Sequence, residues 1–283
     1  MKKILALVLA LVLTLSAAAA LADTIKIGVP DDTTNEARAL QLLADNGVIQ
    51  LKEGAGELAT KADVIAENIE IVEVQADQLV NQLADLDYAV INSNFVLDAL
   101  DAGIQINTAL LVEAEDKYLP RANVVAVNGD NVEAPLTKAL VAAITSQKVK
   151  DYITNTYAGS VLSVVNEPTD GFDATVDYDA LAGQKIIIAA TPAPHTQILE
   201  VVKEILAEKG ITLEISVFTG YTEENPAVAA GDAYANYFQH QQYLDDYVKE
   251  VGGNVVSVTT VHTEPMGLYG GKQADLTALG LTK

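Results

Sequence analysis

Arginine is the scarcest charged residue in this chain, and its two occurrences, Arg38 and Arg121, are candidates for binding an anion. A guanidinium donates parallel hydrogen bonds to a carboxylate and suits that group well. Arg38 is expected in the first turn of a helix that follows a strand and a polar turn, where free backbone amides also favour an anion. The alternative is an ordinary exposed arginine on a helix.

A second candidate is the stretch 234–240, which reads Tyr-Ala-Asn-Tyr-Phe-Gln-His. If it is a strand, Asn236, Phe238 and His240 lie on one face, and Tyr237 and Gln239 lie on the other. An aromatic ring between hydrogen-bonding groups suits a small amphipathic ligand. The same pattern also fits core aromatics beside a histidine that is satisfied within the protein.

The histidines and glycines give weaker signals. His195 follows Thr-Pro-Ala-Pro at the start of an expected helix, where it is either a donor to a ligand or a surface residue. With His240 and His262 it shows no short metal-ligand spacing, so no metal site is expected. Residues 54–59 fit the dinucleotide pattern G-x-G-x-x-A, but the segment after them starts a helix poorly, which favours a surface loop.

No phosphate-binding loop, no G-x-S-x-G motif and no serine paired with a histidine is visible in the sequence. No cofactor is therefore expected, and nothing supports an enzyme.

Composition narrows the possible partners. The 283 residues include 17 Lys+Arg and 39 Asp+Glu, a net charge of −22. This surplus of acid argues against a nucleic-acid partner, which needs a basic surface, and against a polybasic contact with anionic lipid. Cysteine is absent, which excludes disulfides, thiol nucleophiles, Cys–zinc sites and lipid attachment through a cysteine.

Residues 1–22 have the pattern of a signal peptide. Lys2 and Lys3 precede an apolar run to Leu15, and Ala20-Leu21-Ala22 is a small-x-small cleavage site. We expect an exported protein, periplasmic, secreted or at the cell surface, and not lipidated because it has no cysteine. An uncleaved signal that anchors the chain in a membrane is the alternative.

Short β-rich runs alternate with helical stretches, in two blocks separated by a linker at 166–184 that is rich in Asp, Pro, Gly and Thr. The first helix is expected to begin with a capping box of Thr33 and Glu36. Such alternation predicts an α/β fold with mostly parallel sheets. Two blocks suggest two lobes, with a ligand cleft beyond the carboxyl ends of the strands.

Five stretches of the chain resemble the methionine-binding proteins of ABC importers, the MetQ/NlpA family. They are DDTTNEARALQLL (31–43), YAVINSNFVLDA (88–99), AATPAPHTQILEVVKEIL (189–206), GDAYANYFQHQQYL (231–244) and VHTEPMGLY (261–269). The resemblance implies a two-lobe periplasmic-binding-protein-like fold of type II. It also implies non-enzymatic capture of L-methionine or a close analogue, delivered to a membrane permease and ATPase complex.

The order of these stretches differs from that of the family, in which the segment at 189–206 opens the mature protein. The chain therefore resembles a circular permutant joined through 166–184. Permutation is compatible with the fold because domain termini usually lie at the surface, often close together. One lobe is then expected from 23–107 plus 266–283, and the other from 108–265.

The resemblance also implies a set of ligand contacts from both lobes. By this resemblance, Arg38 binds the ligand carboxylate and the asparagines contact the head group. Aromatic and histidine side chains surround the thioether, which is compatible with aromatic neighbours. The implied residues are Asn35, Arg38, Asn92, Asn94, Asn123, His195, Tyr221, Phe238 and His240.

The chain departs from the family pattern at several positions, and Arg121 adds a second cation near the expected site. Three other hypotheses stay open from sequence alone. They are a metal-binding solute receptor, an enzyme on the same two-lobe fold, and a sensory or surface binding module without transport.

Overall fold

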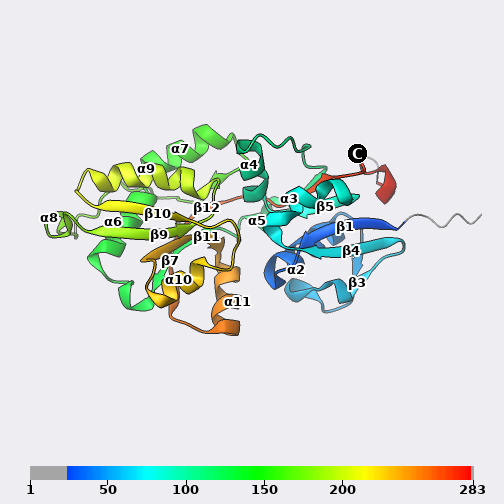
Figure 1. The fold of residues 1–283 in the computed structure, drawn as a ribbon, viewed down its shortest axis with the longest axis horizontal. Helices are drawn as coiled ribbons and strands as arrows, with labels where there is room; N and C mark the ends of the chain where they lie inside the picture. The colour runs from blue at the N-terminus through cyan, green and yellow to red at the C-terminus, as the bar shows by residue number, and fades with distance from the viewer. Residues whose placement is uncertain (1–23, 282–283) are drawn as a thin grey trace, which may run out of the picture.

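Residues 24–281 are described by a computed structural model in which two α/β lobes lie side by side (Figure 1). The expected signal peptide at 1–22 lies outside these residues. Within 24–281, no helix is long and apolar enough to cross a membrane.

The first lobe is built on a five-stranded sheet with the order β4-β1-β5-β13-β6. The strands are β1 (Ile25–Pro30), β4 (Ile69–Val74), β5 (Tyr88–Ile91), β6 (Leu111–Val112) and β13 (Gly267–Gly270). Helix α2 (Thr33–Asp45) covers one face through a core that includes Leu40 and Leu43. Helices α3 (Leu79–Gln82) and α4 (Ser93–Asp101) cover the other face. A small hairpin of β2 (Gln50–Leu51) and β3 (Val64–Ile65) adds to the α2 side.

The second lobe is built on a six-stranded sheet with the order β10-β9-β11-β7-β12-β8. The strands are β7 (Asn123–Asn128), β8 (Leu162–Ser163), β9 (Lys185–Ala190), β10 (Thr212–Val217), β11 (Ala235–His240) and β12 (Val255–Thr263). One face carries α6 (Pro135–Ile144), α7 (Gln147–Tyr157) and α9 (His195–Ala207). The opposite face carries α10 (Glu224–Ala230) and α11 (Gln241–Val251), as Figure 1 shows.

The expectation of mostly parallel sheets is only half right. In each sheet three strands run parallel, β4-β1-β5 in the first and β10-β9-β11 in the second. Strands β13 and β7 are instead inserted antiparallel to both of their neighbours. Each of these two strands enters its lobe from the other lobe, and not through a crossover helix packed on its own sheet.

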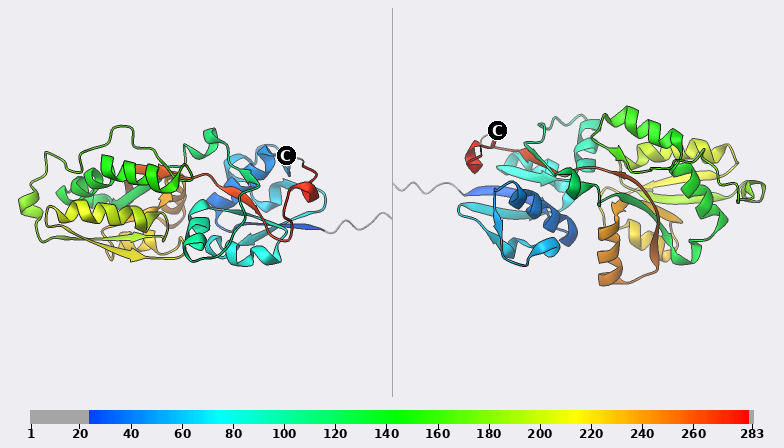
Figure 2. Two further views of the ribbon diagram at one scale, coloured as in Figure 1. Left: turned by 90° about the horizontal axis from the view of Figure 1, so that it is seen from above. Right: turned by 180° about the vertical axis from the view of Figure 1, so that it is seen from behind.

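The chain passes between the lobes twice, through 113–122, which contains α5 (Glu115–Tyr118), and through 264–266. Figure 2 shows the last segment, orange to red, returning to the first lobe. The expected boundary at residue 108 falls before β6, which still pairs with β13 in the first sheet. Strand β6 therefore belongs with the first lobe, and the exact limits of the two lobes stay a prediction.

The expected linker at 166–184 packs on the second lobe. Thr169 pairs with Ser146 in an isolated bridge, and the Lys209 ammonium lies 4.5 Å from the centre of the Phe172 ring. The segment also contains the short helix α8 (Tyr178–Leu181). In the first lobe, Ile25, Leu279 and Leu281 pack against one core cluster, so the two ends of the described chain lie on the same lobe.

Candidate ligand-binding cleft

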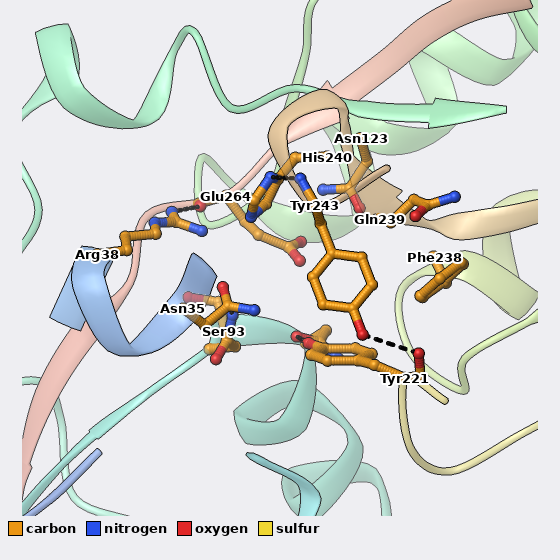
Figure 3. Close-up of a pocket in the computed structure, with 12 residues that line it drawn as sticks. Asn35, Arg38, Ser93, Asn123, Tyr221, Phe238, Gln239, His240, Tyr243 and Glu264 are labelled. Atoms are coloured by element: carbon orange, nitrogen blue, oxygen red, sulfur yellow. Dashed lines mark hydrogen bonds between the residues drawn. The ribbon is translucent and has the colours of Figure 1, made fainter. Parts of the chain in front are cut away.

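A cavity lies between the lobes and is lined by residues of both (Figure 3). Its lining comes from α2, the turn into α4, β7, β11, α11, the loop after β10 and one crossing segment. The lining residues are Asn35, Arg38, Asn92, Ser93, Asn94, Asn123, Tyr221, Phe238, Gln239, His240, Tyr243 and Glu264. The cleft lies at the carboxyl ends of β1, β5 and β11, as expected for a fold of this class.

Helix α2 begins one residue before the expected capping box. Asp32 is the N-cap, and its carboxylate accepts from the backbone N of Asn35 at 2.9 Å. Glu36 instead accepts from the backbone N of Lys61 at 2.7 Å. Arg38 therefore lies in the second turn of the helix, so the helix N-terminal amides do not help it to bind an anion.

Arg38 is buried and already paired with a carboxylate of the protein. Its Nε donates to both carboxylate oxygens of Glu113, at 2.9 and 3.1 Å, and its Nη2 donates to Oε2 of the same residue. Nη2 also donates to the backbone O of Glu264 at 3.0 Å. Because Glu113 occupies the bidentate edge expected to hold a ligand, a ligand carboxylate would meet the Nη1 side of the guanidinium.

Glu264 brings an acidic group into the cavity, where the family resemblance implied only Arg38 and asparagines around the ligand head group. The residue is 8 % exposed, and its Oε2 makes no hydrogen bond with any residue of 24–281. Nε2 of His262 lies 3.3 Å from this oxygen, and no arginine or lysine of the described chain pairs with the carboxylate. The carboxylate is thus placed to accept from a cationic group in the cleft.

Two asparagines form a short chain on the first lobe. Asn35 donates to the Asp32 carboxylate, and its Oδ1 accepts from Asn92 Nδ2 at 2.9 Å. Oδ1 of Asn92 is buried and has no hydrogen-bond partner among the described residues. An unpaired buried acceptor costs about 1–3 kcal/mol, which a donor on a ligand would recover.

Two further asparagines are held by residues of the second lobe. Oδ1 of Asn94 accepts from the Tyr221 hydroxyl at 2.8 Å, and Oδ1 of Asn123 lies 3.1 Å from His195 Nε2. In this orientation both amide nitrogens are left as donors for the cavity. His195 itself does not line the cavity but lies behind Asn123, where burial, with repulsion from His262, holds the pKa of His195 well below its usual range.

Three aromatic rings, those of Tyr221, Phe238 and Tyr243, form a wall at one end of the cavity, and Phe95 packs against Tyr221 without lining the cavity. Tyr221 lies at the centre, with ring centres 5.0 Å from Phe95, 5.9 Å from Phe238 and 5.9 Å from Tyr243. The Tyr243 hydroxyl donates to the backbone O of Tyr221 at 3.0 Å and fixes the loop that carries it. This wall offers an apolar surface to a ligand side chain.

Strand β11 does not keep the strict alternation predicted from sequence. The pairing with β7 shifts between Tyr237 and Gln239, which makes Phe238 the extra residue of a bulge. Gln239 consequently bonds Asn236, at 3.1 Å, where alternation would separate them on opposite faces. The bulge brings Phe238, Gln239 and His240 to the cavity together.

His240 presents an unused donor. Its Nδ1 accepts from the backbone N of Tyr243 at 3.3 Å, which leaves the proton on Nε2. Nε2 is buried and has no partner within 24–281. Burial, with the nearby Arg38 and Arg121 cations, holds the pKa of His240 well below its usual range, so the ring stays neutral.

Several contacts join the lobes across the cleft. The Thr34 hydroxyl of α2 donates to Asp246 of α11 at 2.7 Å. Gln197 of α9 donates to Asp101 of α4. Arg121, which does not line the cavity, donates to Gln242 of α11 at 2.7 Å and lies 3.7 Å from Glu113.

The structure thus gathers most of the expected contact residues on one cavity. Eight of the nine line it, and His195 supports one of the eight. Sequence reasoning missed Ser93, Gln239, Tyr243 and Glu264, although Glu264 lies inside the stretch 261–269 that carried the resemblance. Among the described residues, no group of His, Asp or Glu is arranged to hold a metal ion.

A sequence model of the family described as NlpA lipoprotein matches residues 14–165 and 186–281, most of the chain. The chain belongs to the NlpA lipoprotein family. It is a mixed α/β, two-lobe member of that family.

Individual relatives of this NlpA-family chain match it in part. The methionine-binding lipoprotein MetQ of Bacillus subtilis is 42% identical over 92 residues, 32% of this chain and 34% of the relative. The D-methionine-binding lipoprotein MetQ of Escherichia coli is 34% identical over 150 residues, 50% of this chain and 52% of the relative. The crystal structure of lipoprotein Tp32 from Treponema pallidum covers 48% of this chain and 56% of its own, with 30% identity and a TM-score of 0.40. The chain spans between a third and about half of the length of the two curated relatives.

Proposed function

We propose that this protein is the substrate-binding component of an ABC importer and captures L-methionine or a close analogue in the cleft. The observation that carries the proposal is the set of polar groups that the protein leaves unpaired around one cavity. Asn92 Oδ1 and the Glu264 carboxylate are acceptors, whereas His240 Nε2 is a donor. Nη1 of Arg38 adds a cationic donor on the same lining.

These groups complement an amino-acid zwitterion. An ammonium group donates three hydrogen bonds and suits Glu264 and Asn92, while a carboxylate suits Arg38 and His240. The aromatic wall then receives the side chain, and a thioether gains about 0.3–1.5 kcal/mol from a contact with an aromatic ring. The names of the relatives, methionine-binding and D-methionine-binding lipoproteins, support the same ligand class.

Transport would use closure of the two lobes about the segments 113–122 and 264–266, with the closed form recognised by the permease. The lining comes from both lobes, so a ligand in the cleft contacts both and favours closure. The protein acts as a binding protein and not as an enzyme in this proposal. Several relatives are named lipoproteins, but this sequence contains no cysteine, so we propose export without a lipid on cysteine.

We also propose that the chain is a circular permutant joined through 166–184. The family match is interrupted between residues 165 and 186, which supports a junction there. Ile25, Leu279 and Leu281 pack against one cluster, so an ancestral connection between the present ends needs only a short bridge.

Isothermal titration calorimetry tests the ligand. The protein, refolded to remove any carried ligand, is titrated with L-methionine, D-methionine, norleucine, Gly-Met and divalent metals. We expect stoichiometric binding of methionine. Norleucine should also bind, because a pocket discriminates poorly between side chains of nearly equal size. Its affinity should be lower, because it lacks the sulfur that contacts the aromatic wall.

Glu264→Gln should lower the affinity for methionine at least tenfold, since hydrogen bonds to charged groups contribute about 1.5–3 kcal/mol. Glu115→Gln, a change at an exposed residue of the crossing segment, is the matched control and should leave affinity unchanged. Absence of binding by any amino acid would refute the proposed function, and binding of a metal alone would favour a metal receptor.

A further inference from the structure

Glu113 lies next to the cleft without lining it. The residue follows β6 at the start of a crossing segment and is 6 % exposed. Its carboxylate accepts from Arg38 through Nε and Nη2, and also from the backbone N of Met266 at 3.1 Å. One carboxylate thus joins the candidate ligand-binding arginine to both segments that connect the lobes.

This arrangement decides which part of Arg38 faces the cavity. A guanidinium has five N–H donors in a fixed fork. Glu113 and the backbone O of Glu264 take the hydrogens of Nε and Nη2. The two hydrogens of Nη1 remain for a ligand, so the arginine can meet a carboxylate through one nitrogen only.

The same contact sets the charge of the site. Glu113 is paired with Arg38, and its Oε1 also lies 3.7 Å from Nε of Arg121. Glu264 then faces the cavity as an acid whose carboxylate is not paired with an arginine or lysine of the described chain. A ligand that brings only a negative charge meets this carboxylate without compensation, whereas a zwitterion brings its own ammonium.

We propose that Glu113 is a positioning and specificity-determining residue: it holds Arg38 so that Nη1 meets the ligand carboxylate, and its charge makes the cleft select zwitterions over simple carboxylic acids. The inference rests on the proposed function, since it concerns how the same cleft recognises an amino acid. Glu113 acts through Arg38 and does not touch the ligand itself.

Glu113→Gln tests the inference, because glutamine keeps the shape and removes the charge. Two ligands are titrated by calorimetry, L-methionine and 4-(methylsulfanyl)butanoate, which has the same side chain and carboxylate but no ammonium. We expect the affinity for methionine to fall at least tenfold in the variant. The ratio of the two dissociation constants, analogue over methionine, should fall at least fivefold, because the uncompensated Arg38 favours the anion.

A second variant separates charge from position. Glu113→Asp keeps the charge but shortens the reach to Arg38. The affinity for methionine should therefore fall, while the ratio of the two dissociation constants stays within about threefold of the wild-type value. Glu115→Gln is the exposed control on the same segment and should change neither quantity.

The outcomes separate this inference from the proposed function. If the wild-type protein binds neither ligand, the proposed function fails. If it binds methionine but Glu113→Gln leaves affinity and ratio unchanged, the inference is refuted while the proposed function stands. Equal weakening of both ligands in Glu113→Gln would show a merely structural role and would also overturn it. If Glu113→Gln does not fold, a changed ratio in Glu113→Asp would overturn the charge assignment.

Discussion

Glu224, the first residue of α10, is fully buried, and neither of its carboxyl oxygens has a hydrogen-bond partner among the described residues. Burial, with a smaller contribution from Glu223, raises the pKa of Glu224 from its usual 4.5 to about 8. A pKa difference of one unit corresponds to about 1.4 kcal/mol, so this gap amounts to roughly 5 kcal/mol of unfolding free energy.

The sign follows from the protons bound in each state. Between pH 4.5 and pH 8 the folded protein keeps a proton on Glu224 that the unfolded chain has already released. The free energy of unfolding therefore falls by about 1.4 kcal/mol per pH unit as the pH rises, and the loss is complete above the folded pKa of about 8. Glu224→Gln has no proton to lose at this position, so its stability should not fall in this way.

The difference in stability between Glu224→Gln and wild type is the quantity to measure, because all other titrating groups cancel in it. Urea unfolding followed by circular dichroism from pH 5 to pH 9 should show the difference growing in favour of the variant. The growth should reach about 3 kcal/mol between pH 5 and pH 7. Glu223→Gln, at the exposed neighbour, should show almost no growth. Parallel stability curves for wild type and Glu224→Gln would refute the assigned burial of an uncompensated acid.

Three further predictions concern the cleft and the order of the chain. Arg38→Lys keeps the charge but cannot hold Glu113 and present Nη1 together, so calorimetry should show methionine weakened at least tenfold; unchanged affinity would contradict the assigned contact. Tyr221→Phe removes the hydroxyl that donates to Asn94, and we expect about two- to tenfold weaker binding. A loss above a hundredfold would mean that the hydroxyl contacts the ligand directly. Joining residue 281 to residue 24 by a short Gly-Ser linker and opening the chain between 174 and 175 should preserve the circular-dichroism spectrum and methionine affinity. A soluble rearranged monomer that no longer binds would argue against the permutation.

The sequence predicts the class of this fold well because helices and strands alternate with clear periodicity. It predicts the direction of β7 and β13 poorly, because nothing local in those strands shows that each is inserted antiparallel between neighbours that are distant along the chain. The bulge at Phe238 is hidden for a similar reason, since the shift depends on the pairing with β7 and not on the strand alone.

The candidate site was predictable where the residue type itself carries the chemistry. Arg38 was a candidate for a carboxylate contact from its residue type, whereas the four asparagines were expected in the site only because of the resemblance to the family. The pairing of Arg38 with Glu113, 75 positions away, was not predictable, because nothing in the sequence distinguishes Glu113 from the other acidic residues among the 39. For the same reason the sequence did not distinguish Glu264, which faces the cavity, from acids on the surface.

The insertion of β13 has a consequence for the order in which the lobes fold. β13 lies between β5 and β6 in the first sheet, yet the chain reaches it only after every strand of the second lobe. The second sheet is contiguous from β7 to β12 and can fold as a unit as soon as it has been synthesised. The first lobe lacks an interior strand until that point, so we expect the lobe that is begun first to be the last one to fold. If the chain is exported as proposed and crosses the membrane unfolded, this delay would keep the leading part of the polypeptide extended until synthesis is nearly complete.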